Sequence, residues 1–197
     1  TSYLVANAII LPMTGWLASR FGRSRLLLGS VVGFTVSSFL CGFAPNLPFL
    51  VVFRIVQGAT GGGLQPLSQA ILMEVFPPAE RGKAMAFWAL GIVVAPMLGP
   101  VLGGWLTDNY SWRWVFYINV PIGLLAVVLT RMYVFDPPYL AKKGGRVDYL
   151  GMGLLVVGIG ALQLLVDKGQ QEDWFSSPFI VALAAIVLYA HRATIRA

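Results

Sequence analysis

Charged residues are scarce in this 197-residue sequence, and their scarcity excludes an ordinary water-soluble domain. Asp, Glu, Lys and Arg make up 11% of the residues, whereas hydrophobic residues make up 57%. An average soluble domain carries roughly 25% charged residues. The mean hydropathy of +0.76 agrees with this contrast. Most of the surface must therefore face something other than water, as it does in membrane-spanning helices.

Cysteine and histidine are nearly absent, which removes the material for several kinds of site. The sequence holds one cysteine, Cys41, within an apolar segment, and one histidine, His191, beside Arg192. A single cysteine supports neither an intrachain disulfide nor a multi-cysteine metal site. An intramembrane enzyme would need a nucleophile with a base, and no suitable base accompanies Ser37 or Ser68. We therefore expect no enzyme, no bound metal and no cofactor.

Long charge-poor runs predict an all-α membrane bundle of about seven spanning helices. The runs cover residues 1 to 18, 26 to 44, 48 to 72, 83 to 106, 114 to 135, 149 to 166 and 174 to 190. The first five are joined by short connections, so neighbouring helices should be antiparallel. Prolines followed by a basic, glycine-containing stretch mark a boundary after the fifth. We divide the chain into helices at 1–135, a linker at 136–148 and two further helices at 149–197.

Basic residues collect at one side of the predicted helices. That side holds Arg20, Arg23, Arg25, Arg81, Lys83, Arg131, Lys142, Lys143, Arg146, Arg192 and Arg196, and the other holds Arg113 and Lys168. The asymmetry predicts that the first side is cytoplasmic. These cations therefore serve as topology signals, and we expect no nucleic-acid partner.

The connection after the first run combines glycine with arginine, from Gly15 through Arg20, Gly22 and Arg23. A tight reversal favours glycine because it adopts positive backbone dihedrals without strain. The arginines can bind helix-end carbonyls or acidic groups of a neighbouring helix. A simple positive anchor is the plainer interpretation.

The third run contains an arginine well inside an apolar helix. Arg54, Gln57, Gly58, Gly61 and Gln65 share one face at helical spacing. An unpaired arginine in hydrocarbon costs from about 2.5 kcal/mol upward, so this face should meet a partner or a watery cavity. Snorkelling of the side chain to the outer surface is the alternative.

The fourth run places prolines and glycines on one stripe of one helix. Its members are Gly91, Pro96, Gly99, Pro100, Gly103 and Gly104. Such a stripe combines kink sites with close-approach sites, although ordinary small-residue packing has the same composition. Three further amides, Asn7, Gln65 and Asn119, are candidates for lining a cavity or for helix-to-helix hydrogen bonds.

These motifs resemble those of the major facilitator superfamily, in the order in which that family carries them. Residues 15–25 are similar to the loop motif G-x-L-x-D-R-x-G-R, except that Ser19 replaces its acidic residue. Arg54, Gln57 and Gly58 match R-x-x-Q-G, which the family associates with proton coupling. The fourth run resembles the exporter motif G-x-x-x-G-P-x-x-G-G, with Ala95 where its earlier glycine stands.

The start of the fifth run, residues 111–123, resembles the fourteen-helix drug:proton antiporter branch of the EmrB/QacA type, which has two extra helices between its halves. The resemblance implies a partial chain of a multi-pass transporter of the inner membrane. It implies that a proton gradient drives export of amphipathic or cationic compounds, with a periplasmic adaptor as a candidate partner. A proton-coupled uptake carrier and a non-transporting scaffold or sensor are the alternatives.

Overall fold

The computed structural model describes residues 2–135 and 149–196. Its helices are α1 (Ser2–Phe21), α2 (Arg23–Phe43), α3 (Leu47–Gly61), α4 (Leu64–Val75), α5 (Arg81–Asn109), α6 (Trp114–Tyr117), α7 (Asn119–Tyr133), α8 (Tyr149–Gly169), the short 3₁₀ turn η1 (Trp174–Ser176) and α9 (Pro178–Arg196). These ranges contain no strand. The all-α prediction is confirmed, and the predicted linker 136–148 lies outside the described residues.

Six stretches of the described chain are long and apolar enough to cross a membrane, and Pro178–Ala193 is a shorter apolar helix. Two spans consist of paired helices, α3 with α4 and α6 with α7. We expected 48 to 72 as one helix, but the structure interrupts it with a turn at Gly62 and Gly63. Hydropathy does not reveal such a break, because both halves are apolar.

Large apolar side chains point outward rather than inward. Phe43, Val101 and Phe135 are each at least two-thirds exposed, whereas α2 buries Ser37 and Ser38. This inversion is expected when lipid surrounds the bundle, because an apolar side chain that faces lipid carries no free-energy penalty. The buried hydroxyl of Ser37 donates to the Gly33 carbonyl of its own helix, at 2.7 Å, so it remains satisfied.

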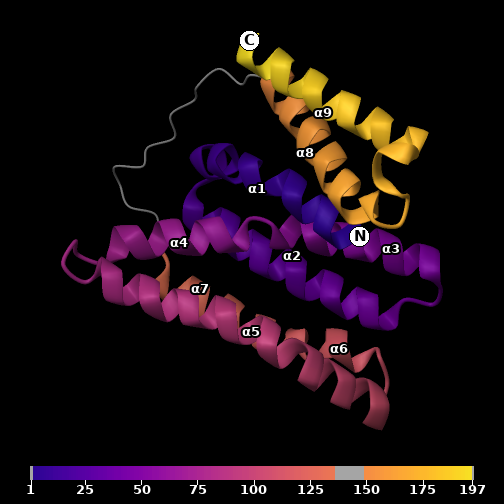
Figure 1. The fold of residues 1–197 in the computed structure, drawn as a ribbon. Helices are drawn as coiled ribbons and strands as arrows, with labels where there is room; N and C mark the ends of the chain where they lie inside the picture. Colours follow the sequence, from indigo (N-terminus) through magenta and orange to yellow (C-terminus); the bar gives the residue numbers. More distant parts are fainter. Residues whose placement is uncertain (1, 136–148, 197) are drawn as a thin grey trace.

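The helices form a central cluster with two flanks (Figure 1). α1, α2 and α3 pack on one another, and α7 lies against α2. α8 and α9 pair with each other, and α8 also packs on α1. α5 lies on the other side of the cluster and contacts α4 and α6. Among the described residues, no helix therefore covers the long middle of α5.

Candidate functional site

Arg54 of α3 lies at the centre of a small polar cluster inside the helix bundle. Its Nη1 donates to Gln57 Oε1 at 2.9 Å, one turn along the same helix. The guanidinium carbon lies 4.6 Å from the Tyr3 ring centroid and 5.5 Å from that of Phe116. Within the described residues Arg54 has no carboxylate partner. An amide and two aromatic faces thus hold the charge without neutralising it.

Gln57 connects this arginine to α2. Its side chain is only 2% exposed, and its Nε2 donates to the hydroxyl of Ser38. The Cys41 thiol donates to the Oε1 of Gln57 at 3.8 Å. Both the oxygen and the nitrogen of the amide are therefore used, as a buried amide requires. The network joins α3 to α2 at the level of Arg54.

Gly58 lets α1 and α3 approach closely beside Arg54. A Cβ built on Gly58 would lie 2.3 Å from the Tyr3 carbonyl oxygen and 3.0 Å from the Ala6 Cβ. No real side chain tolerates such contacts, so glycine is required there by space rather than by backbone conformation. The close approach also brings the Tyr3 ring to Arg54.

The other predicted polar residues are only partly brought to this cluster. Asn7 Nδ2 donates to the Tyr3 hydroxyl at 3.5 Å, so it lies in the next layer around Arg54. Gln65 lies in the first turn of α4, beyond the turn at Gly62 and Gly63, and is exposed, so its predicted place on the Arg54 face stays a prediction. Asn119 bonds the Val115 carbonyl nearby in the chain, at 3.4 Å.

The arginine and glycine loop joins α1 to α2, as expected. Gly22 has φ 90° and ψ 148°, which confirms that the reversal needs a positive dihedral. Arg23 forms an ion pair of 2.6 Å with Glu74 at the end of α4. The Ser19 hydroxyl donates to the Trp16 carbonyl of its own helix. A Cβ added at Gly15 would meet no atom within 4 Å, and Arg20 is exposed.

The proline and glycine stripe faces open space. Pro96 and Pro100 lie inside α5, and every residue from 91 to 100 is exposed. An added Cβ at Gly91, Gly99, Gly103 or Gly104 would meet nothing within 4 Å. Toward its start α5 is held by the Trp88 indole, which donates to the Ser68 hydroxyl at 3.1 Å. Among the described residues, the stripe thus presents a surface that nothing covers.

Sequence reasoning missed three contributors to this arrangement. We counted Arg113 among the topology signals, but its guanidinium donates to the carbonyls of Gly42 (3.0 Å) and Ala44 (3.2 Å) at the end of α2. Tyr3 and Phe116 supply the rings around Arg54. Basic side chains bond the free carbonyls at helix C-termini, but the helix end that Arg113 reaches belongs to another span, which the sequence does not indicate. Ring contacts between spans leave no signal in the sequence either.

Known proteins resemble the chain in sequence and in fold. The Major Facilitator Superfamily profile matches residues 1–190. The chain is 50% identical over 188 residues to the multidrug export protein EmrB of Haemophilus influenzae, covering 95% of this chain and 37% of that protein. It is 48% identical over 188 residues to the fatty acid resistance protein FarB of Neisseria gonorrhoeae, covering 95% of this chain and 37% of that protein.

The EmrB protein of Escherichia coli K12 is 46% identical over 190 residues, covering 96% of this chain and 37% of that protein. The crystal structure of a D-xylose–proton symporter aligns with a TM-score of 0.61 at 20% identity, over 96% of this chain and 54% of that one. The chain spans 37% of the length of the curated relatives it matches. Since the family profile covers nearly all of it, the chain belongs to the Major Facilitator Superfamily.

Proposed function

We propose that this chain is part of a proton-coupled exporter of amphipathic or cationic compounds. Its superfamily and its relatives are transporters, and the relatives' names refer to multidrug export. The observation that carries the proposal is Arg54, a charge held inside the bundle by Gln57 and two aromatic rings with no carboxylate partner in the described residues. A charge that is not neutralised there responds strongly to a proton that binds nearby.

Arg54 itself does not carry the proton, because a guanidinium stays protonated in proteins. The acidic residues of the described helices lie in their last turns, as Glu74, Asp108 and Asp167 do. The group that takes up the proton is therefore expected in another part of the protein. Arg54 would favour the ionised form of that group and release it upon protonation.

Export rather than uptake is supported by the α5 stripe and by the relatives. The likeness to the D-xylose–proton symporter bears on the fold alone. In alternating access, the repeats of a transporter rock against each other around a site near the bilayer midplane. The exposed stripe of α5 offers a proline-containing, small-residue surface suited to such motion. A periplasmic adaptor and an inner-membrane location, with the Arg20 end cytoplasmic, belong to the same proposal.

The test is a transport assay on the full-length protein in inside-out vesicles. A proton gradient should drive an amphipathic cation such as ethidium into the vesicles, with coupled proton release. Replacing Arg54 with Ala should abolish both fluxes at normal insertion, whereas Arg131→Ala, an exposed arginine in the last turn of α7, should leave them unchanged. Unchanged fluxes in Arg54→Ala would remove Arg54 from the mechanism. Ethidium movement in the opposite direction would favour an uptake carrier, and no flux in the native protein would favour a scaffold.

A further inference from the structure

A cavity of about 400 Å³ opens between α1, α2 and α3 near the end that carries the basic loop. Its walls are mainly apolar, formed by Ile10, Leu17, Phe21, Leu26 and the backbone around Gly29. Two exposed arginines, Arg20 and Arg25, also line it, and we call them the rim arginines. It is separate from the Arg54 cluster, none of whose side chains lines it.

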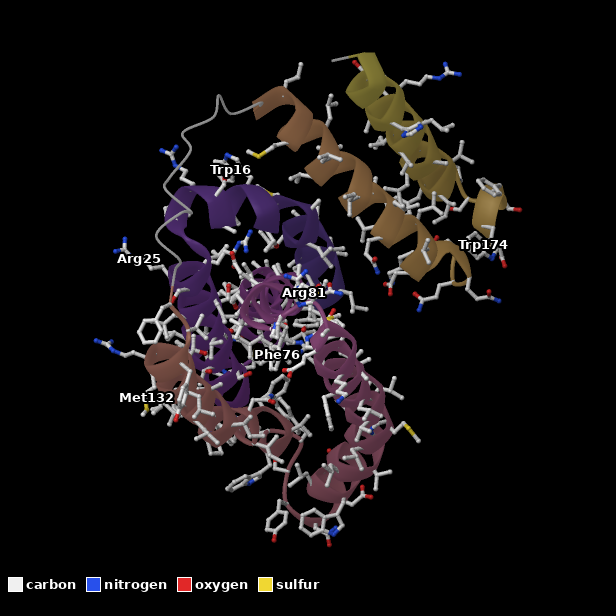
Figure 2. All side chains as sticks on the ribbon, turned by 90° about the vertical axis from the view of Figure 1, so that its left-hand side faces the viewer. Trp16, Arg25, Phe76, Arg81, Met132 and Trp174 are labelled. Atoms are coloured by element: carbon white, nitrogen blue, oxygen red, sulfur yellow. The ribbon has the colours of Figure 1, made fainter. Side chains whose placement is uncertain are left out.

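Both rim arginines lack a partner within the part of the chain that the structure describes. Neither Arg20 nor Arg25 makes a hydrogen bond or ion pair there, whereas Arg23 between them is paired with Glu74. Ser19, where related loops carry an acidic residue, bonds its own helix instead and offers Arg20 no charge. Figure 2 shows the Arg25 side chain extending away from the ribbon. The rim therefore keeps two positive charges that no described residue compensates.

The inner wall holds a polar group that is also unused. Ser30 is 9% exposed and lines the cavity, and its hydroxyl has no hydrogen-bond partner among the described residues. Its neighbour Thr14 is 3% exposed, but its hydroxyl already donates to the Ile10 carbonyl at 3.0 Å. No buried side-chain oxygen or nitrogen of the described residues lacks a hydrogen-bond partner, so the Ser30 hydroxyl is accessible from the cavity and can donate to or accept from an occupant.

We propose that this cavity binds an anionic phospholipid of the leaflet at the Arg20 end. Its phosphate would lie between Arg20 and Arg25, an ester oxygen would reach Ser30, and an acyl chain would follow the apolar wall. The dimensions agree, because the ten helical steps from Ile10 to Arg20 rise about 15 Å, half of a hydrocarbon core of about 30 Å. A free phosphate ion would leave the apolar wall uncovered, which favours the lipid. Basic pockets between membrane helices on the cytoplasmic side are suited to anionic headgroups.

The test uses native mass spectrometry of the purified full-length protein with phosphatidylglycerol, and with phosphatidylcholine as the zwitterionic comparison of zero net charge, which should bind more weakly. A single basic residue near an anionic leaflet contributes about fivefold, so Arg20→Ala with Arg25→Ala should weaken phosphatidylglycerol binding about 30-fold. The matched control, Arg131→Ala with Arg192→Ala, removes two exposed charges from the same predicted side but outside the cavity. It should change binding less than about twofold. Equal loss in both double variants would overturn the proposal.

A second pair of variants tests the cavity itself with all arginines retained. A Cβ at Gly29 meets no atom within 4 Å, so Gly29→Phe should fill the cavity without disturbing the fold and should displace the lipid. Val36→Phe, at an exposed position of the same helix outside the cavity, should have no effect. If Gly29→Phe still binds phosphatidylglycerol normally, or if excess inorganic phosphate displaces the lipid completely, the proposed lipid site is wrong. The outcome does not depend on export, because binding is measured without transport.

Discussion

The contact between α1 and α3 at Gly58 allows a quantitative prediction. In Gly58→Ala the new methyl group would lie 2.3 Å from the Tyr3 carbonyl oxygen. Since the obstacle is backbone and not the end of a flexible side chain, α1 must move away by about 1.1 Å to restore an ordinary contact of 3.4 Å. Such overpacking costs about 1 to 3 kcal/mol, with a backbone obstacle at the upper end.

Alanine also favours the helix, and this gain must be subtracted. In a helix interior alanine is about 1 kcal/mol more favourable than glycine. The free energy of unfolding of Gly58→Ala should therefore fall by about 1 to 2 kcal/mol. Gly29→Ala is the matched control, because its methyl group meets nothing within 4 Å. It should be neutral or stabilised by up to about 1 kcal/mol.

The measurement is reversible unfolding by sodium dodecyl sulfate, followed by circular dichroism on the purified protein in mild detergent. Gly58→Ala should also lower proton-coupled flux, because moving α1 withdraws the Tyr3 ring from Arg54. If Gly58→Ala and Gly29→Ala unfold with the same free energy, the close approach of α1 and α3 at this point is refuted.

Three further changes should act through named contacts. Glu74→Gln breaks the ion pair with Arg23; the Glu74 side chain is 18% exposed and that of Arg23 is 32% exposed. The free energy of unfolding should fall by about 1 kcal/mol in the same assay. No loss would mean that solvent screens the pair. Gln57→Leu removes the partner of Arg54 and of a hydroxyl on α2, so the free energy of unfolding should fall by about 1 to 3 kcal/mol. An unchanged unfolding midpoint would contradict the network. Arg113→Ala frees two carbonyls, so hydrogen exchange of the amides at the end of α2 should speed up while that of α8 stays constant; uniform exchange would count against the contact.

The helices were largely predictable because lipid imposes length and apolarity on each span. The run predicted at 26 to 44 corresponds to α2 (Arg23–Phe43), and the run at 83 to 106 to α5 (Arg81–Asn109). The interruption at Gly62 and Gly63 was not predicted. It interrupts the regular helical hydrogen bonding without changing the hydropathy, on which the prediction of each span depended.

The contacts of the site were predictable within one helix but not between helices. Gln57 as the partner of Arg54 follows from helical spacing, since residues three apart share a face. The Tyr3 and Phe116 rings come from two other helices, so their contacts depend on which spans are neighbours. The spacing of residues within one helix does not indicate which spans are neighbours. The roles assigned to the glycines and prolines of α5 likewise remain predictions, because their surface has no neighbour in the described residues.

Arginine takes three different kinds of partner in this structure, and the difference bears on proton coupling. Arg23 meets a carboxylate, Arg113 meets backbone carbonyls, and Arg54 meets a neutral amide and aromatic rings. Because nothing on the described chain neutralises Arg54, its charge remains available to a proton-binding carboxylate. At about 7 Å and an effective dielectric constant near 20, that attraction is about 2 kcal/mol. Where the two groups meet in only one of two conformational states, protonation of the carboxylate would remove this attraction and shift the equilibrium between the states roughly 30-fold. A neutral amide leaves this attraction intact, whereas a salt bridge at the same position would cancel it.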